Sequence, residues 1–310
     1  MADHVHIQEV GLRDGLQSIA AVMPTAAKKR WIRAAYDAGV RHIEVTSFVP
    51  PRLLPQLADA AEIVDYALQL EGLIVTALVP NLKGAENALK AGVHRMVAPI
   101  SVSTQHSLAN VRRAPMEMVQ EFSRIRERID AQNAGTTLIA GLSTVFGCTL
   151  QGEVPIDDVC NIVRGSLAAG ADTVALADTT GHATPAQVQE VIGAVRAVAG
   201  AQFRSMHFHD TRGMGLANTV IALQNGIREF DASLAGIGGC PHAPGATGNV
   251  VTEDLVFMLE SMGYRTGISV EGLLACRSVL TEALPQEPLY GFIHRAGLPN
   301  TYFTQQRASQ

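Results

Sequence analysis

Cysteine is scarce in this 310-residue sequence, and the few cysteines present are far apart. They are Cys148, Cys160, Cys240 and Cys276, and no two of them form a CxxC pair. Disulfide frameworks stabilise small secreted domains, whereas isolated thiols in a chain of this size are typical of a reducing compartment. We therefore expect a cytoplasmic protein with free thiols, most of them buried, because a free cysteine packs as a small hydrophobic side chain.

The sequence also has no surplus of positive charge and no long apolar run, and its first residues match no targeting pattern that we recognise. Its net charge is -5, which argues against a nucleic-acid-binding surface. No apolar run reaches the roughly 18 residues that a membrane span needs. Residues 1–4 do not begin a secretory signal, which would be basic and then apolar, or an Arg/Ser-rich transit peptide. We expect no nucleic-acid partner, no membrane association and no targeting segment.

What the sequence does contain is enough apolar material for a large core and one local pattern that recurs. Hydrophobic residues make up 47% of the chain, which is long enough for one large barrel or two ordinary domains. Repeatedly, a helical segment ends at a glycine, the expected left-handed cap, and a short β-rich run follows. The predicted strands are residues 4–10, 40–48, 73–79, 93–102, 136–145, 171–178, 203–209 and 227–234.

This alternation of strand and helix, eight times over, predicts a closed (β/α)8 TIM barrel of parallel strands. The Thr-Pro-Ala-Gln sequence at 184–187 predicts one helix start with a capping box. An open doubly wound α/β sheet is the alternative fold, but residues 11–15 do not match the GxGxxG spacing of its nucleotide-binding turn. We predict a catalytic barrel over residues 1–264 and a C-terminal helical extension, 265–310, packed over one end of the barrel.

Catalytic residues of a TIM barrel lie at the C-terminal ends of the strands and in the loops that follow. The first strand ends in Glu9, Arg13 and Asp14, charges that are costly inside a barrel unless they are paired or bind a metal. A structural ion pair beneath a loop is the other interpretation. His207 and His209 are two residues apart on the seventh strand, so both imidazoles face one side and could share a divalent cation. The alternative for them is a pair of satisfied surface histidines.

The eighth strand leads into a long loop, residues 236–249, that is rich in glycine and proline. Loops of this length in compact domains are usually functional. Cys240 in this loop is either a candidate acid or base above a metal site or an incidental small residue. Asn249 could cap the helix that follows or bind the metal. Glu44 and Asp178 put carboxylates at the ends of the second and sixth strands, where each could support the site rather than act in catalysis.

Four of these side chains together form a plausible ligand set for a metal ion. Asp14, His207, His209 and Asn249 offer two nitrogen and two oxygen atoms. That set suits an octahedral divalent ion such as Mg2+ or Mn2+, with water or substrate oxygens completing the coordination. A closed structural zinc site would contain more sulfur.

The same residues lie in motifs that extend from the first strand to the eighth helix. The motifs are EVGLRDGLQ at 9–17, IEVTSF at 43–48, FHDT at 208–211 with LANT at 216–219, and GGCP at 238–241 with GNVVTEDL at 248–255. They resemble those of the 3-hydroxy-3-methylglutaryl-CoA lyase family, metal-dependent TIM-barrel lyases related to isopropylmalate and homocitrate synthases. The resemblance implies retro-Claisen cleavage of 3-hydroxy-3-methylglutaryl-CoA to acetyl-CoA and acetoacetate.

The resemblance also implies roles for individual residues. The divalent metal, Mg2+ or Mn2+, would be held by the four ligands named above. Arg13 would polarise the carbonyl and stabilise the enolate, and Cys240 would be the catalytic thiol. The catalytic candidates as a whole are Arg13, Cys240, Glu44, Asp178 and His207, with the two carboxylates in supporting positions. The expected partner is an acyl-CoA substrate, and a homodimer is our expectation because barrels of this size often pair through helices.

Several residues that could face the pocket depart from the family pattern. Cys-Thr-Leu-Gln-Gly at 148–152 replaces Cys-Pro-Tyr-Glu-Gly, and Ser-Thr-Gln-His at 103–106 replaces a Ser-Glu-aromatic pattern. Ala175, Arg212 and His242 stand where Ser, Tyr and Tyr are common. A related 3-hydroxyacyl-CoA such as citramalyl-CoA, cleaved to acetyl-CoA and pyruvate, is therefore an alternative substrate. Arg212 could contact an additional carboxylate or a CoA phosphate, or it could simply be solvated.

Two further hypotheses remain at this point. A Claisen-condensing acyltransferase on the same scaffold would make the bond instead of breaking it, but Leu16, where the related synthases carry Glu, and the short C-terminal region argue against it. A non-catalytic barrel that binds a metal or CoA is the third hypothesis, and the complete set of candidate catalytic residues argues against that one.

Overall fold

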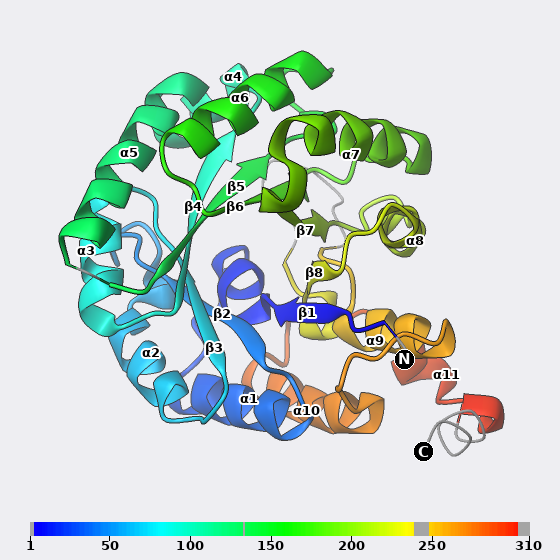
Figure 1. The fold of residues 1–310 in the computed structure, drawn as a ribbon. Coiled ribbons are helices and arrows are strands. Elements are labelled where there is room, and N and C mark those ends of the chain that lie inside the picture. The colour runs from blue at the N-terminus through cyan, green and yellow to red at the C-terminus, as the bar shows by residue number, and fades with distance from the viewer. Residues whose placement is uncertain (1–2, 133, 239–247, 303–310) are drawn as a thin grey trace.

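A computed structural model of the chain describes residues 3–132, 134–238 and 248–302. Eight parallel strands close into a barrel in sequence order, with β1 paired to both β2 and β8, and helices surround it (Figure 1). The TIM-barrel prediction is confirmed, and all eight strands lie within the predicted runs. They are β1 (His6–Glu9), β2 (His42–Ser47), β3 (Ile74–Leu78), β4 (Arg95–Ser101), β5 (Thr137–Ser143), β6 (Thr173–Asp178), β7 (Phe203–Phe208) and β8 (Glu229–Ala232).

The helices lie between the strands on the outside of the barrel, and α4 is an additional short helix between β4 and α5. The predicted capping box is present at α7, where Thr184 and Gln187 each accept a hydrogen bond from the other's backbone N–H. The helices are α1 (Thr25–Asp37), α2 (Ala60–Leu68), α3 (Leu82–Ala91), α4 (Thr104–Val111), α5 (Pro115–Ala131), α6 (Ile156–Ala168), α7 (Pro185–Ala199), α8 (Gly215–Gln224), α9 (Thr252–Ser261), α10 (Val270–Ala283) and α11 (Ile293–Ala296).

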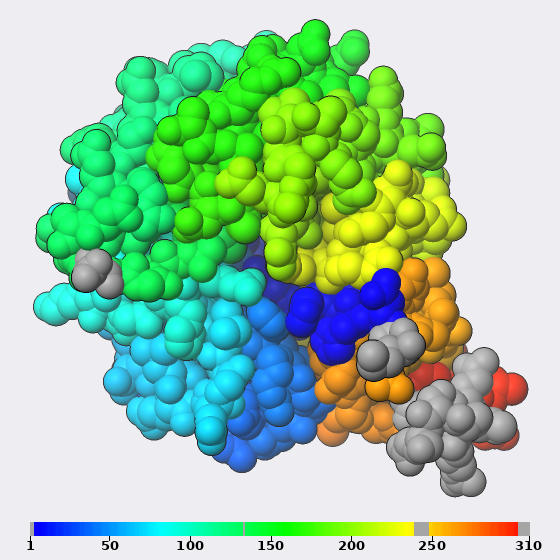
Figure 2. Space-filling view, in the orientation of Figure 1, coloured from blue at the N-terminus to red at the C-terminus, as the bar shows by residue number. Residues whose placement is uncertain are grey.

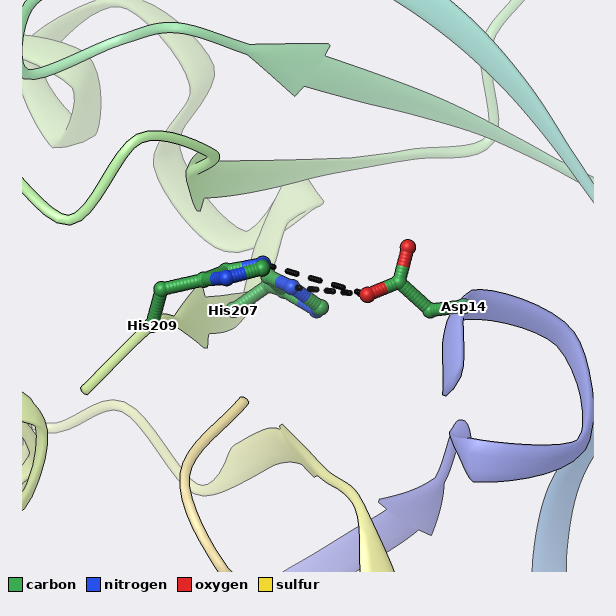
Figure 3. A group of neighbouring side chains, drawn as sticks. All are labelled: Asp14, His207 and His209. Carbon is green, nitrogen blue, oxygen red and sulfur yellow. Dashed lines mark ion pairs between the residues drawn. The ribbon is translucent and has the colours of Figure 1, made fainter. Parts of the chain in front are cut away.

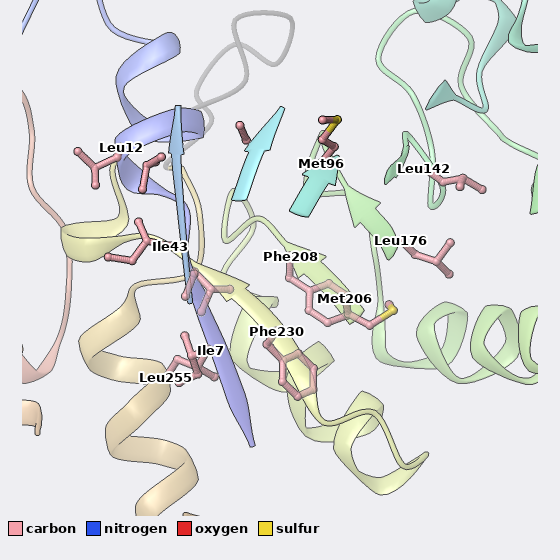
Figure 4. Close-up of a cluster of buried hydrophobic side chains, with 14 of the residues drawn as sticks. Ile7, Leu12, Ile43, Met96, Leu142, Leu176, Met206, Phe208, Phe230 and Leu255 are labelled. Atoms are coloured by element: carbon pink, nitrogen blue, oxygen red, sulfur yellow. The ribbon is translucent and has the colours of Figure 1, made fainter. Parts of the chain in front are cut away.

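The hydrophobic core lies between the outer faces of the strands and the helices. Side chains that point outward from the strands, such as Ile7, Ile43 and Met206, are buried there together with Leu255 of α9 (Figure 4). Within the described ranges, no helix combines the length and the apolarity needed to cross a membrane.

Glycine is required where the chain leaves β1. A Cβ atom on Gly11 would lie 2.7 Å from the indole ring of Trp31, which is fully buried in α1, and 2.6 Å from Oε1 of Glu9. The loop that carries the first candidate residues therefore packs directly on α1.

The described part of the C-terminal extension packs beside α1 and α9 in the outer ring of helices (Figure 1). The apolar face of α10 explains this placement, because Val270, Leu273 and Leu280 are fully buried. Polar contacts add to the packing. Arg277 of α10 lies 2.6 Å from Glu253 of α9, a buried ion pair.

The space-filling view shows the face on which the chain begins, with a hollow beside the N-terminal segment (Figure 2). A cavity of about 220 Å³ lies at this N-terminal end of the barrel. It is lined by strand residues, among them His6, His42, Arg95, Arg204 and Glu229. The candidate catalytic residues belong to the other end, where the strands finish.

Candidate functional site

Asp14, His207 and His209 meet at the C-terminal end of the barrel (Figure 3). One potential ligand atom from each lies within 4.8 Å of the others, so the group could hold a metal ion. Oδ2 of Asp14 is 4.0 Å from Nε2 of His207 and 3.8 Å from Nε2 of His209. The side chains of His207 and His209 are 10% and 5% exposed, which rules out a pair of surface histidines.

A tight helical turn places Asp14 in this group. Residues 11–15 form one turn in which the backbone N–H groups of Arg13 and Asp14 both donate to Val10 O. Close packing on the eighth strand's loop holds the turn in place, since a Cβ on Gly15 would lie 2.7 Å from the side chain of Ile237. The turn follows β1 directly, so it presents Asp14 toward the end of β7 across the barrel mouth.

Asn249 lies against the same group. It forms an isolated β-bridge with His209, and its Nδ2 donates to Oδ2 of Asp14 at 2.8 Å. The helix that follows begins at Thr252 with Val251 in the capping position, so the hypothesis that Asn249 caps this helix is wrong. Oδ1 of Asn249 is buried and has no hydrogen-bond partner among the residues that the structure describes. A buried amide oxygen left without a partner is costly, and a cation at this position would satisfy it.

The protonation states of Asp14 and His209 suit a divalent cation. Burial alone would raise the pKa of Asp14, but Arg13, His207 and His209 together lower it to about 2. Burial and the neighbouring His207 lower the pKa of His209 to about 4, so its imidazole is neutral near pH 7. One carboxylate, two imidazoles and the unpartnered amide oxygen match the donors that Mg2+ or Mn2+ takes with water completing the coordination, so the residues present fit such an ion.

Arg13 links Glu44 to the candidate metal-binding group, which consists of Asp14, His207 and His209. We call these three residues the metal-binding group. Its Nη1 lies 2.6 Å from Oδ1 of Asp14, and its Nη2 lies 2.7 Å from Oε2 of Glu44. The two carboxylates raise the pKa of Arg13 against the effect of burial, so the guanidinium is charged. Burial raises the pKa of Glu44, whose ionised form Arg13 stabilises. Arg13 is therefore a fixed positive charge beside the metal-binding group.

Glu9, which the sequence places in the same motif, belongs to the structural framework instead. Its carboxylate accepts hydrogen bonds from Gly11 N, Leu234 N and the hydroxyl of Thr252. These bonds tie the loop after β1 to the loop after β8 and the start of α9. The three charges at the end of β1 thus divide into two that form the site and one that supports its loops.

Asp178 holds a loop as well. Its two carboxylate oxygens accept from the backbone N–H groups of His182 and Ala183, at 2.8 and 3.1 Å. Burial raises its pKa to about 6. Arg212 donates from Nη1 to the carbonyl of Gly181 at 2.6 Å, which ties the loop after β7 to the loop after β6. Arg212 is therefore not simply a solvated side chain.

Two arrangements were not predicted from the sequence. Asp231 of β8 lies with Oδ2 at 3.1 Å from Nδ1 of His207. At the ends of β4 and β5, Ser143 donates to the hydroxyl of Ser101, whose Oγ lies 2.8 Å from Nδ1 of the buried His106. The only sequence signal for Asp231 is a carboxylate inside a short buried strand. His106 coincides with one of the departures from the family pattern.

Two candidates cannot be placed. Cys240 and His242 lie outside the described residues, so the structure does not test the predicted catalytic thiol. Described residues on both sides of that segment do reach the site. Asn249 donates a hydrogen bond to Asp14, and Ile237 packs against Gly15.

Comparison with known proteins agrees with this geometry. The model of the HMGL-like family matches residues 4–280. The hydroxymethylglutaryl-CoA lyase YngG of Bacillus subtilis is 41% identical over 280 residues, which are 90% of this chain and 93% of the relative. The crystal structure of the Bacillus subtilis HMG-CoA lyase superposes with a TM-score of 0.89 at 40% identity, covering 94% of this chain and 97% of that one.

A second solved structure is similarly close. An HMG-CoA lyase from Acinetobacter baumannii, in complex with coenzyme A and 3-methylmalate, has a TM-score of 0.90 at 36% identity and covers 96% of both chains. These relatives are lyases, which favours the lyase hypothesis over a condensing acyltransferase or a non-catalytic barrel. The family model, the sequence identity and the shared fold all show that this chain belongs to the hydroxymethylglutaryl-CoA lyase family.

Proposed function

We propose that this protein cleaves 3-hydroxy-3-methylglutaryl-CoA to acetyl-CoA and acetoacetate. The observation that carries the proposal is the Asp14–His207–His209 group with the buried Arg13 beside it at the C-terminal end of the barrel. The lyases named above, 36–41% identical to this chain, support the choice of substrate. Coenzyme A in the Acinetobacter complex supports an acyl-CoA as the ligand of this barrel too.

The reaction requires two changes of charge. The tertiary hydroxyl at C3 loses its proton and becomes a ketone as the C2–C3 bond breaks. The electron pair of that bond moves into the thioester, which becomes an enolate and is then protonated at C2. A divalent cation held by Asp14, His207, His209 and Asn249 would supply a positive charge that lowers the pKa of the tertiary hydroxyl.

Arg13 provides the second positive charge. A preorganised charge in a site that excludes water stabilises a developing oxyanion without further reorganisation. Asp14 and Glu44 hold the guanidinium in one orientation, so we assign Arg13 to the thioester oxygen, where the enolate charge appears. Glu44 then positions Arg13 and does not itself touch the substrate.

The remaining candidates would transfer protons, bind the metal or support a loop. Cys240 would return a proton to C2 of the enolate. His207 would act beside the reacting hydroxyl as well as binding the metal. Asp178 would support the loop after β6, because its carboxylate accepts hydrogen bonds from backbone N–H groups of that loop.

One assay tests the proposal directly. Acetyl-CoA release is measured from 3-hydroxy-3-methylglutaryl-CoA and from citramalyl-CoA, with Mg2+ or Mn2+ and after chelation. Metal-dependent release from the first substrate is the expected result. Release from citramalyl-CoA alone would keep the reaction and change the substrate, and release from neither would contradict the proposal.

The citramalyl-CoA arm has a specific reason. The Acinetobacter relative was solved with 3-methylmalate, a positional isomer of the diacid in citramalyl-CoA. In this chain, Ala175 of β6 and His106 differ from the family pattern, and His106 contacts the hydroxyl of Ser101 at the end of β4. Incubation of acetyl-CoA with pyruvate or acetoacetate in the same assay would detect a net condensing activity.

The identity of the metal, the assembly state and the location of the protein are further proposals. Reconstitution of the metal-free protein with Mg2+ and Mn2+ in parallel would decide which ion supports turnover. We propose a homodimer, which light scattering coupled to gel filtration would test. We propose a cytoplasmic location because Cys148, Cys160 and Cys276 are all free and buried.

A further inference from the structure

A row of polar side chains crosses the interior of the barrel beneath the metal-binding group. Nδ1 of His207 lies 3.1 Å from Oδ2 of Asp231, and Oδ1 of Asp231 accepts from Nε2 of Gln8 at 3.2 Å. Oε1 of Gln8 in turn accepts from the hydroxyl of Thr76 at 3.0 Å. The row thus joins β7, β8, β1 and β3 through hydrogen bonds between side chains alone.

The register of the barrel produces this row. Asp231 is the direct neighbour of His207 on one side and of Gln8 on the other. Paired positions on neighbouring strands point to the same face, so all three side chains face inward. Gln8 and Asp231 also line the N-terminal cavity of the barrel.

The hydrogen bonds of the row converge on Asp231 from both sides. An ionised carboxylate only accepts, so Asp231 must receive a proton donor on each oxygen. Gln8 supplies one through its amide group. The other oxygen is left for Nδ1 of His207, which must then carry its hydrogen, and a neutral imidazole with a hydrogen on Nδ1 has its lone pair on Nε2. Nε2 is the atom that faces Asp14 in the metal-binding group.

We propose that Asp231 is a positioning residue that holds His207 in the Nδ1–H tautomer and so presents Nε2 as a metal ligand, with Gln8 as its support. The inference rests on the metal site of the proposed function. Carboxylates that orient a ligating histidine in this way contribute substantially to metal affinity. His209 provides the contrast, because its Nδ1 is buried without a partner among the described residues.

The tautomer can be measured without metal or substrate. Long-range 15N–1H spectra of the metal-free protein with labelled histidine distinguish a hydrogen on Nδ1 from one on Nε2. We expect His207 to be the Nδ1–H form in the unmodified protein and to lose that preference in Asp231→Ala. An unchanged His207 spectrum in Asp231→Ala would overturn the proposal.

Metal affinity is the second measurement, made by calorimetric titration of Mn2+ into the metal-free protein. Loss of an orienting carboxylate typically weakens metal binding by about 10–100-fold, and we expect Asp231→Ala to fall in that range. Asp231→Asn should recover part of the loss, since its amide oxygen still accepts from Nδ1. Gln8→Ala should weaken binding less than Asp231→Ala, and it also serves if Asp231→Ala does not fold.

Glu229→Gln is the matched control. Glu229 is on the same strand and faces the same interior, but it pairs with Arg204 and Arg95, not with a histidine of the site. The Mn2+ affinity of Glu229→Gln should equal that of the unmodified protein. An equal loss of Mn2+ affinity in Glu229→Gln and Asp231→Ala would overturn the specific role of Asp231. Because neither measurement uses an acyl-CoA, failure of this inference is distinct from failure of the proposed lyase activity.

Discussion

Nη2 of Arg13 lies 2.7 Å from Oε2 of Glu44, and the Glu44 side chain is only 1% exposed. Nη1 of the same guanidinium is 2.6 Å from Asp14. One planar cation is thereby held at two of its nitrogens by carboxylates that come from the turn after β1 and from β2. A buried charge held in this way cannot turn away from a reacting thioester without leaving both carboxylates unpaired.

Arg13→Lys is expected to lower kcat by about 100–1,000-fold, the usual cost of losing one oxyanion-stabilising donor. A lysine ammonium is a point charge and cannot span Asp14 and Glu44 as the planar guanidinium does. Steady-state cleavage of the acyl-CoA, with Mn2+ affinity measured in parallel, checks this. Arg33→Lys, at an exposed pair with Asp37, is the control and should behave like the unmodified protein. A wild-type kcat in Arg13→Lys would contradict the assigned role.

Removal of the metal is expected to lower thermal stability. A ligand that binds only the folded state at about 100 times its Kd stabilises that state by about 2.7 kcal/mol. Calorimetric scans with Mn2+ and with chelator should therefore differ by several degrees. His209→Ala should abolish the difference, whereas His294→Ala, an exposed histidine of α11, should retain it. If Mn2+ raised the unfolding temperature of the two variants equally, His209 would be excluded as a ligand.

Stability should fall as the pH rises between about 4.5 and 7 because of Glu9. Burial raises the pKa of Glu9 from its ordinary value of 4.5 to about 7. Between these two values the folded state keeps a proton on Glu9 that the unfolded chain has lost. The contribution of Glu9 to the free energy of unfolding is therefore complete below pH 4.5 and is lost as the pH approaches 7. Each unit of pKa difference corresponds to about 1.4 kcal/mol.

Urea unfolding of the unmodified protein and of Glu9→Gln, at pH 5 and pH 7.5, measures the contribution of Glu9 to the pH dependence of stability. Relative to the unmodified protein, Glu9→Gln should have a higher free energy of unfolding at pH 7.5 than it has at pH 5. Parallel pH profiles for the two proteins would show that Glu9 titrates normally in the folded state.

Arg277→Met is expected to lower the free energy of unfolding by about 3–5 kcal/mol, because it leaves a buried carboxylate without its cation. Glu253 is 1% exposed in the pair, and its other bonds are to the backbone N–H of Ala235. Urea denaturation measures the change. Arg33→Met, which breaks a pair more than half exposed on both sides, should cost no more than about 1 kcal/mol. A similar loss in the two variants would contradict the burial argument.

Local periodicity was enough for the predicted barrel and for much of the candidate site. Glycine caps and β-rich runs mark the eight strands because helix termination and strand composition are properties of short segments. His207 and His209 face one side because strand residues two apart always do. The motif residues Arg13 and Asp14 follow β1 directly, so a closed barrel brings them to its C-terminal end. The resemblance of these motifs to a known lyase family is confirmed by the comparisons.

Other features depend on contacts between residues far apart in the chain. Asp231 meets His207 because β7 and β8 pair in one particular register, and α10 lies beside α1 because its apolar face finds a partner there. The same argument separates Glu9, which turns to the loops, from Arg13 and Asp14 in the same motif. Sequence alone determined the order of strands and helices and the kinds of side chain at the strand ends. Only the tertiary structure decided which of those side chains meet, because barrel closure and strand register, not local periodicity, set distances across the barrel.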